Sequence, residues 1–400
     1  MIPEVREAYN RAYTDEQYQA FHQQLYDVIG DHATFRLSET PIFLPDELAN
    51  ELLDSCNRIS DVIATPSGLA ATTGAIRAPY WSIHGEPDRP LFLQYDFALC
   101  ATDDGIRPWL IELQGFPSLY FFQADLARSF RENLPVPAGY SSFFNGFDES
   151  SYVELLREVI MGEHAPESVI LLEIEPAKQN TRIDFLATAN QIQLPTVSLE
   201  ELERNGKKLF YRREGRIIPV TRIYNRVILD ELNTKDLSKY EFTLREEVDV
   251  EWAGHPDWFL RISKHTLPAI GHLPNVPVTT FANEYVAGSW DLSKYVLKPL
   301  YSFSGAGVNL NPTEADISAL ERPQNWILQR KVAYGPVLQT PTGPAKCEVR
   351  MMLVWRPGEE RPTVVNNLVR ITKGEMTGVK YNNEATWVGA SVAMHRLGKK

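Results

Sequence analysis

The sequence predicts a protein of mixed α+β and α/β class, with mixed sheets, flanking helices and an α/β subdomain. Three patterns in the chain support this prediction. Residues 1–90 carry apolar side chains at helical spacing. Residues 169–197 have the order strand, helix, strand that is typical of a βαβ unit. From residue 294 onward, apolar strand-like runs follow one another and are separated by stretches rich in Pro and Gly.

The N-terminal region predicts two amphipathic helices. In residues 15–30, aromatic and aliphatic side chains recur at helical spacing, and Gly30 ends the run. The second helix begins at residues 44–47, where Pro45 and two acidic residues suit a first helical turn. Its apolar positions then recur with a period near four up to residue 62.

The middle of the chain predicts an antiparallel strand pair and then the α/β region. The runs 91–100 and 109–114 are separated by the turn sequence Thr102-Asp103-Asp104-Gly105, so we expect them to pair. Further elements are expected as a helix at 150–162, a strand at 169–174, a helix at 182–192, a strand at 194–197, strands within 207–226 and a helix near 258–270. The C-terminal strands are expected at 294–298, 306–310, 325–333, 346–356 and 362–371.

Length and composition indicate an ordinary globular protein. The 400 residues suffice for two to three domains, and 44% apolar with 23% charged residues excludes a disordered chain. The net charge of −12 disfavours binding to nucleic acid or to an anionic membrane surface. The charge is uneven, because residues 294–400 hold 15 basic and 8 acidic side chains, a balance of +7, and the rest of the chain is at −19. Such segregation either is accidental or marks a face that handles anions.

Cysteine usage and the N-terminus predict a soluble, reduced, cytoplasmic protein. Cys56, Cys100 and Cys347 are too widely spaced for a disulfide framework or a zinc site. The charged N-terminal segment has no apolar core of a signal peptide, and no run of about 18 apolar residues occurs. No nucleophile triad is visible, and His255, His265 and His272 lack the spacing of a helical metal site.

The segment that starts at Tyr295 predicts a phosphate site. Lys298 ends an apolar strand, and a loop with Ser304, Gly305, Ala306 and Gly307 follows at once. Glycines let backbone N–H groups approach phosphate oxygens, and the lysine supplies a point charge. The loop lacks the Gly-Lys-Ser/Thr of a Walker A motif and the third glycine of a dinucleotide fingerprint. The alternative interpretation is a Gly-rich hairpin beside a surface lysine.

Asp96, Glu112 and Gln114 predict a magnesium site. Glu112 and Gln114 are two residues apart in a strand and therefore share a face, and an antiparallel pairing brings Asp96 beside them. Magnesium prefers hard oxygen ligands and retains several waters, so two carboxylates and a carboxamide suffice when nucleotide phosphates complete the site. The alternative is a solvated sheet face whose acids bind nothing.

Charged residues also lie inside the later apolar strands, where a partner must offset their desolvation. Arg350 and Arg370 are the main examples, and an alternative for Arg350 is a structural ion pair with Glu348 two residues away. The aromatic residues at 116–122 are expected in the core.

These residues resemble the circularly permuted ATP-grasp proteins, in particular the glutathionylspermidine-synthase-like branch. The resemblance is carried by Lys298-Pro299 with SFSGAGV, by LLEIEPAKQNTRIDF and VTRIYNRVILDEL, and by Asp96 with Glu112-x-Gln114. The metal strand precedes the lysine strand, which is the permuted order. The resemblance extends from about residue 90 to the C-terminus.

The resemblance implies a role for each matching residue. Lys298 would contact the α and β phosphates of ATP, and the backbone of residues 304–307 would close over the β/γ end. The strand at Leu328–Val332, which includes Gln329, would form the adenine hinge, and Lys331 would reach the base or the α-phosphate. Asp96, Glu112 and Gln114 would hold Mg²⁺. Arg350 and Arg370 would lie near the transferring phosphate or an acyl-phosphate oxygen, and Arg226 near the substrate. The implied division is a helical region at 1–90, the metal strand pair with core helices at 91–160, the α/β subdomain at 161–290 and the nucleotide-binding subdomain at 291–400.

The resemblance further implies an ATP- and Mg²⁺-dependent ligase that joins a small-molecule carboxylate to an amine through an acyl phosphate. Such chemistry needs cations and a water-excluding site and no protein nucleophile. Two departures from the family pattern keep an alternative open. Gln114 replaces a usual asparagine, and Gln94 stands where relatives often carry arginine. The alternative is a nucleotide-binding module without ligase activity, and a kinase is a third reading. The sequence leaves the identity of both substrates and the oligomeric state open.

Overall fold

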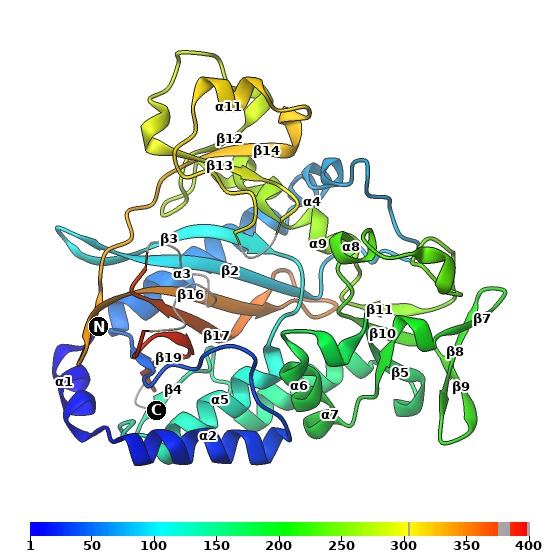
Figure 1. Cartoon of the computed structure of the whole chain (residues 1–400), viewed down its shortest axis with the longest axis horizontal. Coiled ribbons are helices and arrows are strands. Elements are labelled where there is room, and N and C mark those ends of the chain that lie inside the picture. Colours follow the sequence, from blue (N-terminus) through cyan, green and yellow to red (C-terminus); the bar gives the residue numbers. More distant parts are fainter. Residues whose placement is uncertain (303–304, 375–384, 398–400) are drawn as a thin grey trace.

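A six-stranded antiparallel sheet forms the centre of the molecule (Figure 1). The structure is a computed structural model that describes residues 1–302, 305–374 and 385–397. The strand order is β18-β17-β16-β2-β3, and β15 pairs with β16 beside this path. The strands are β2 (Phe92–Thr102), β3 (Gly105–Gln114), β15 (Leu338–Thr340), β16 (Gly343–Val354), β17 (Thr363–Thr372) and β18 (Gly389–Ser391). The antiparallel pairing of β2 with β3 confirms the sequence prediction.

The two faces of this large sheet differ in polarity. Successive side chains of a strand point to opposite faces, so Leu93, Tyr95 and Phe97 of β2 face one way and Gln94 and Asp96 face the other. The apolar set is fully buried in a core cluster shared with helix α3 (Asp46–Ile63), which the sequence predicts over 44–62. Burying each large apolar side chain contributes roughly 1.5–3 kcal/mol. The opposite face carries the charged residues.

The α/β region forms a parallel four-stranded sheet of order β11-β10-β5-β6, at the right of Figure 1. Its elements are α6 (Glu149–Met161), β5 (Val169–Glu173), α7 (Arg182–Ile192), β6 (Thr196–Ser198), β10 (Arg222–Asn225), α8 (Leu229–Leu232) and β11 (Glu251–Ala253). A small antiparallel sheet, β7 (Glu203–Asn205), β8 (Lys208–Arg213) and β9 (Arg216–Val220), extends from it. The parallel pairing of β5 with β6 confirms the predicted βαβ unit.

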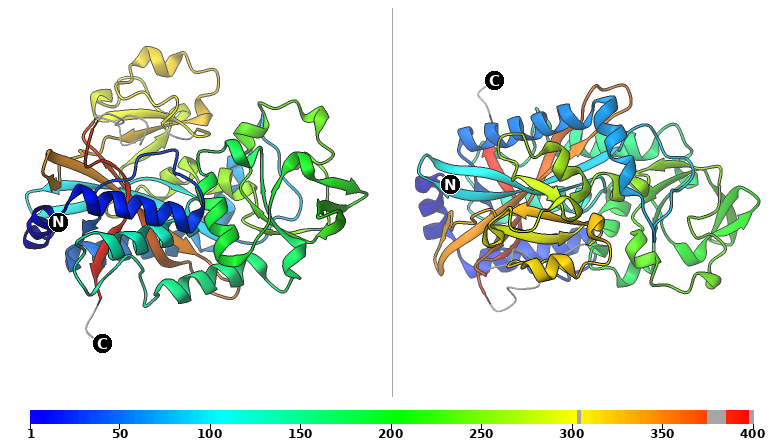
Figure 2. Two further views of the ribbon diagram at one scale, coloured as in Figure 1. Left: turned by 60° about the horizontal axis from the view of Figure 1, so that its bottom comes forward. Right: turned by 90° about the horizontal axis from the view of Figure 1, so that it is seen from above.

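A third sheet, of order β12-β14-β13, lies over the large sheet, as the view from above shows (Figure 2). Its strands are β12 (Thr279–Phe281), β13 (Tyr295–Pro299) and β14 (Trp326–Arg330), with α11 (Glu314–Ser318) beside them. Lys298 of β13 pairs in register with Ile327 of β14. The predicted strands near 294–298 and 325–333 are therefore present.

The N-terminal helices pack around the large sheet and the C-terminal strand. They are α1 (Pro3–Ala12), α2 (Asp15–Ile29), α3 and α4 (Pro66–Ala71), and α2 packs against α5 (Tyr120–Asn133). Thr14 caps α2, and Gly30 ends it in the left-handed conformation that its φ of 91° requires. β1 (Ile42–Phe43) pairs in parallel with β19 (Ala393–Arg396), which also pairs with β4 (Tyr140–Ser141). Within the described residues, no helix combines the length and apolar character needed to cross a membrane.

Two predicted elements are wrong. The expected strand at 306–310 is a loop whose contact with β13 is a single bridge between Leu297 and Asn309. Gly305 and Gly307 have φ near +70°, which an extended strand does not allow. The expected helix at 258–270 is divided into α9 (Asp257–Arg261), a 3₁₀ turn (Lys264–Thr266) and α10 (Leu267–Ile270). The Ser263 side chain accepts the His265 N–H and starts the new turn.

Short 3₁₀ turns complete the described secondary structure. Besides Lys264–Thr266, they are Thr73–Ala75, Pro166–Ser168, Pro176–Lys178, Leu199–Glu201, Leu237–Lys239, Ala282–Glu284, Leu292–Lys294 and Pro323–Asn325. Cys56, Cys100 and Cys347 are buried and free, in agreement with the expectation that they form no disulfide framework.

Candidate functional site

The polar face of the large sheet gathers most of the predicted site residues. Asp96 of β2 is paired in register with Glu112 of β3 and with Arg350 of β16. Arg370 of β17 is paired with Glu348 of β16. These residues come from four adjacent strands, and side-chain alternation turns all of them toward the same face. The predicted neighbourhood of Asp96 and Glu112 is thus present.

Asp96 is the buried centre of an arginine network. Its side chain is 1% exposed, and it accepts a bidentate pair from Arg350, with Nε 2.6 Å from Oδ1 and Nη2 2.7 Å from Oδ2. Arg370 Nη2 also donates to Asp96 Oδ2 and lies 2.8 Å from Glu348 Oε1. Burial raises the pKa of Asp96, but the guanidinium groups of Arg350 and Arg370 outweigh it and hold that pKa below its usual value. The carboxyl group is therefore ionised.

The remaining charges of this network are balanced in the same way. Burial disfavours the charged form of Arg370, yet the carboxylates of Glu348 and Asp96 outweigh burial and raise its pKa. Tyr334 donates from its hydroxyl to Glu348 Oε2 at 3.1 Å. Burial and the adjacent Glu348 raise the pKa of Tyr334 well above its ordinary value, so the phenol stays protonated and donates.

Glu112 and Gln114 lie at the more open end of this face. The Glu112 side chain is 31% exposed, and its Oε2 lies 3.9 Å from Lys264 Nζ. Gln114 donates from Nε2 to Gln94 Oε1, while Gln94 Nε2 donates to the Ser118 carbonyl at 2.7 Å. Arg350 Nη1 also reaches Gln94 Oε1 at 3.2 Å. Gln94 thus links Arg350 to Gln114.

Lys298 and Gln329 project from the β12-β14-β13 sheet toward β3. Lys298 Nζ donates to Gln329 Oε1 at 2.6 Å and to the Ile111 carbonyl at 3.5 Å. Gln329 Nε2 donates to the same carbonyl at 3.3 Å. The pKa of Lys298 is lowered to about 8, mainly by burial; Glu112 opposes this shift, and Lys264 adds to it. The ammonium group therefore lies in a low-dielectric setting, where an anionic partner would interact with it strongly.

The other predicted nucleotide residues lie around this centre. Gly305, Ala306 and Gly307 form an exposed turn after β13, and Ser304 lies outside the described residues. Lys331 donates to the Ser293 carbonyl at 2.7 Å and to Asn311 Oδ1 at 3.1 Å, so it braces the loops beside β13. Val332 begins the link from β14 to β15, and its carbonyl accepts the Tyr334 N–H at 3.1 Å.

Arg226 lies in a different, closed cluster. It follows β10, is 2% exposed, and its guanidinium lies 5.0 Å from the Phe116 ring centroid and 5.4 Å from that of Phe185. The acidic residues that interact with it are Glu173 at the end of β5 and Asp184 on α7, which are 4% and 0% exposed. The aromatic residues near 116–122 are core residues, as predicted.

Lys264 is a site residue that the sequence reasoning missed. It lies on the 3₁₀ turn after α9, is 7% exposed, and donates from Nζ to the Ser302 carbonyl at 2.7 Å. The surrounding sequence RISKHTLP shows no motif and no period that marks this lysine. A lysine between two apolar segments is a weak indication of a site residue. Its proximity to Glu112 is evident only in the tertiary structure.

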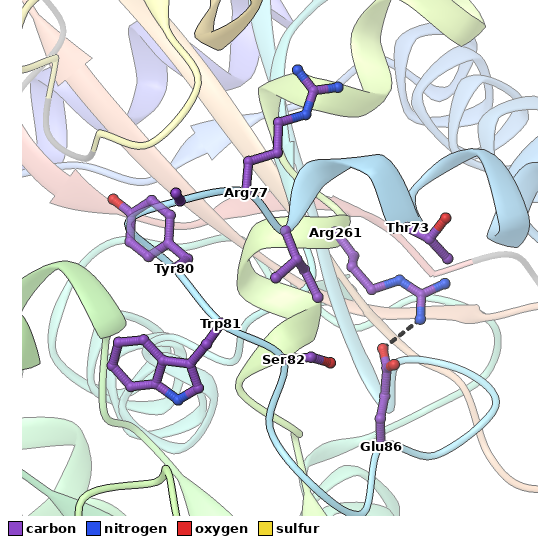
Figure 3. Close-up of a pocket in the computed structure, with 9 residues that line it drawn as sticks. Thr73, Arg77, Tyr80, Trp81, Ser82, Glu86 and Arg261 are labelled. Atoms are coloured by element: carbon purple, nitrogen blue, oxygen red, sulfur yellow. Dashed lines mark hydrogen bonds and ion pairs between the residues drawn. The ribbon is translucent and has the colours of Figure 1, made fainter.

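A cavity of about 400 Å³ lies beside the segment that follows α4 (Figure 3). Its lining includes Thr73, Arg77, Tyr80, Trp81, Ser82, Glu86 and Arg261. The Arg261 guanidinium is occupied, because it binds Glu86, Thr72 Oγ1 at 3.0 Å and the Leu69 carbonyl at 2.8 Å. None of the residues predicted for the nucleotide site lines this cavity.

Three potential metal donors also meet near that cavity, in Glu86, His255 and Asp257. Each is already engaged. Asp257 accepts from Ser82 Oγ at 2.8 Å, and His255 accepts the Asp257 N–H at Nδ1 while its Nε2 lies 3.3 Å from the His84 carbonyl. These contacts satisfy the polar groups of the cluster, which links α9 to the segment that follows α4.

The arrangement of sheets is similar to a solved structure, a glutathione synthetase-like effector from Globodera pallida in its apo form. The two chains superimpose with a TM-score of 0.55 over 97% of this chain and 99% of the other, at 12% sequence identity. At this sequence identity, the likeness shows that the two chains share a fold. The observed helices and sheets confirm the predicted mixed α+β class, and the likeness is consistent with an ATP-grasp-like fold. No protein-family model and no curated protein matches the sequence.

Proposed function

We propose that the chain is an ATP- and Mg²⁺-dependent ligase that joins a small-molecule carboxylate to an amine. The observation that carries this proposal is the buried Lys298 ammonium, which faces the arginine–carboxylate face of the large sheet across the Ile111 carbonyl. The finer assignment, a circularly permuted ATP-grasp protein of the glutathionylspermidine-synthase-like branch, is part of the proposal. It is supported by chain order, because β2 and β3 precede β13.

The polar face of the large sheet offers the type of ligand atom that a magnesium ion prefers. Glu112 and Asp96 supply carboxylate oxygens and Gln114 supplies a carboxamide oxygen, all of them hard ligands on neighbouring positions. Glu112 and Gln114 are the main candidates, since both Asp96 oxygens already accept guanidinium hydrogen bonds. When bound, Mg²⁺ would offset the negative charge of the phosphoryl group that is transferred.

The chain's own residues would then bind and position ATP. Lys298 holds phosphate oxygens, and Arg350 and Arg370 direct positive charge to the transferring group from positions that Asp96 fixes. The substrate carboxylate attacks the γ-phosphorus and ADP leaves. The amine then attacks the acyl carbon, phosphate leaves, and the nitrogen loses its proton as the amide forms. The loop that contains Gly305 and Gly307 would exclude water from the acyl phosphate.

The test begins with Lys298→Met, compared with Lys235→Met, whose lysine pairs with Glu175 away from this face. Because charged hydrogen bonds are worth about 1.5–3 kcal/mol, Lys298→Met should weaken Mg·ATP binding about 10–100-fold in a calorimetric titration. Lys235→Met should bind as the unaltered chain does. Equal affinity in Lys298→Met would overturn the assignment of the phosphate site.

Turnover separates the ligase from its alternative, a nucleotide-binding module without ligase activity. Gln94 motivates this alternative, because it is a neutral residue between Arg350 and Gln114 where a further cation would aid phosphoryl transfer. ADP release is measured across pools of amines and small acids, with Glu112→Gln as the control that loses turnover more than binding. Stabilisation by Mg·ATP without ADP release in any pool would favour the binding module. A phosphorylated product without an amide would indicate a kinase.

A further inference from the structure

The segment that joins α4 to β2 lies between two parts of the molecule. After the 3₁₀ turn Thr73–Ala75, the chain forms no helix or strand before Phe92. In Figure 1 this segment runs from α4, beside the β12-β14-β13 sheet, to the α/β region. We name residues 73–86 the strap. Because the strap lacks the hydrogen bonds of a helix or sheet, the contacts of its side chains and carbonyl groups determine its position.

The second half of the strap is anchored to α9 and to the α/β region. The buried carboxylate of Asp257 accepts Ser82 Oγ at 2.8 Å and the Ile83 N–H at 3.1 Å. Ile83 is 5% exposed and belongs to the hydrophobic core of the α/β region. The Arg245 guanidinium lies 3.9 Å from the centroid of the Trp81 ring. Buried groups and a cation–π contact therefore hold this half in place.

Two arginines link the first half of the strap to the turn that leads into β14. Arg77 Nη1 donates to the Gln324 carbonyl at 3.1 Å. In the opposite direction, Arg322 Nη1 donates to the Ala78 carbonyl at 3.1 Å. Both hydrogen bonds are exposed, so water competes with them and each contributes little to stability.

Two tyrosines complete the connection between the β12-β14-β13 sheet and the α/β region. Tyr301, which follows β13, donates from its hydroxyl to the Ala75 carbonyl. Its ring packs against Tyr80, with the ring centroids 4.8 Å apart. Tyr80, which projects from the strap in Figure 3, donates from its hydroxyl to Asp230 on α8. The strap thus contacts both parts of the molecule at once.

The β12-β14-β13 sheet has a small hydrophobic core of its own. Ala282, Leu297, Ile317 and Leu328 form this separate cluster, whereas Ile327 belongs to the core cluster of the large sheet. A unit with its own core can shift as a rigid body without unfolding. The sheet can therefore move away from the large sheet once its contacts with the strap are released.

We propose that the strap is a latch for the β12-β14-β13 sheet. Its second half stays fixed to α9 and the α/β region, and release of its contacts with Tyr301, Arg322 and Gln324 frees the sheet to open. Burial supports this order, because contacts exposed to solvent open at a lower free energy than buried ones. The latch itself requires no nucleotide. Only its effect on nucleotide exchange rests on the proposed function.

Thiol labelling measures the opening without a ligand. Ile327→Cys places a thiol at a position that is 0% exposed between the two sheets, and the native Cys56, also buried and free, reports global unfolding. In this background, Arg77→Met and Arg322→Met each remove one hydrogen bond of the latch. Each variant should raise the labelling rate at residue 327 about 3–10-fold and leave the rate at Cys56 unchanged.

Arg157→Met is the matched control. Arg157 Nη2 also donates to a backbone carbonyl, that of Gln191 at 3.0 Å, but it lies on α6 and contacts no part of the strap. This variant should change neither labelling rate.

Two outcomes of the labelling would overturn the latch. Unchanged labelling at residue 327 in Arg77→Met and Arg322→Met would show that the strap does not hold the sheet. Equal increases at residue 327 and Cys56 would show that these contacts stabilise the whole fold instead.

Tyr301→Phe, in the chain with native Ile327, tests the effect on nucleotide exchange. It removes the hydroxyl bond to Ala75 and keeps the ring beside Tyr80. If the site opens before nucleotide enters or leaves, the association and dissociation rate constants for Mg·ADP should both increase about 3–10-fold. The Kd should then change less than about twofold. Tyr211→Phe, which removes a hydroxyl bond to the Glu167 carbonyl at 2.9 Å, is the control and should change neither rate constant.

The rate constants also separate the latch from a direct contact with nucleotide. An increase in the dissociation rate constant alone would make Tyr301 a ligand contact and contradict its role in the latch, as would two unchanged rate constants. If the unaltered chain bound no Mg·ADP, the proposed function would fail, and the labelling at residue 327 would still support or overturn the latch.

Discussion

Two buried charge clusters of this protein have similar compositions and opposite settings. On the large sheet, Asp96 meets Arg350 and Arg370, and the face stays partly open, with 21% of the Arg370 side chain exposed. At the carboxyl ends of β5 and β10, Glu173, Asp184 and Arg226 are each at most 4% exposed. A charge within an apolar strand therefore does not by itself indicate a functional site. The cluster that solvent reaches is a candidate binding site, whereas the enclosed cluster is expected to stabilise the fold.

The closed cluster should dominate stability, and Asp184→Ala tests this. The Asp184 carboxylate accepts the N–H groups of Leu119, Phe121 and Phe122 at 3.0–3.1 Å, which begin helix α5. Its loss leaves these three N–H groups without their acceptor and removes an acidic group that interacts with the Arg226 guanidinium. We expect the free energy of unfolding in urea to fall by about 3–5 kcal/mol. Asp184→Asn, which keeps a carbonyl oxygen, should lose less.

A small loss of stability in Asp184→Ala would contradict a dominant contribution of the closed cluster. A fall below about 1 kcal/mol would show that Arg226 and the helix terminus find other partners. A selective loss of Mg·ATP affinity at full stability would place the cluster in the nucleotide site. Either result would remove the distinction between the two settings.

The sequence predicted elements and local pairs better than long-range contacts. Strand alternation and the Asp-Asp-Gly turn sufficed to place Asp96 beside Glu112, since both lie on one hairpin. The helix expected over 258–270 failed because Ser263 and Pro268 favour a new turn, a competition that periodicity does not register.

The site residues show the same limit. Lys298 and Gln329 meet across one antiparallel pair and were both predicted. Lys264 and Ser302 are 38 residues apart in the sequence, so no local pattern indicates that they are in contact. Arg226 carries a charge in an apolar run just as Arg350 does, and its enclosure by Phe116 and Phe185 depends on contacts distant in sequence.

The two settings should also respond to pH with opposite signs. Burial raises the pKa of Glu173 to about 8, so between its unfolded value near 4.5 and about 8 the folded state holds more protons than the unfolded state. Stability from this group is fully present below pH 4.5 and is lost as pH rises through about 8. The expected loss is on the order of 2–4 kcal/mol, measured as the difference between the unaltered chain and Glu173→Gln.

Lys298 supplies the opposite slope. Burial lowers its pKa from 10.5 to about 8, so between these values the folded state holds fewer protons, and stability rises with pH. ATP binding needs the charged ammonium and should therefore weaken as pH rises through about 8. Lys298→Arg stays charged and should flatten the dependence. If Glu173→Gln and Lys298→Arg changed the pH dependence of the unfolding free energy in the same direction, the two groups would not act with opposite signs.

Tyr334→Phe should have the smallest effect on stability, and it tests whether the two clusters differ in how strongly they stabilise the fold. It removes one hydrogen bond, from the Tyr334 hydroxyl to Glu348 Oε2 at 3.1 Å, and leaves the ring in place. We expect a loss of about 0.5–1.5 kcal/mol in unfolding free energy, because Glu348 retains its bond to Arg370. Because the lost hydrogen bond is made to Glu348 and Arg370 keeps its ion pairs with Asp96 and Glu348, ATP affinity should change less than about threefold. A loss comparable to that of Asp184→Ala would mean that the open face is as tightly closed as the buried cluster, and the difference in access would not explain their roles.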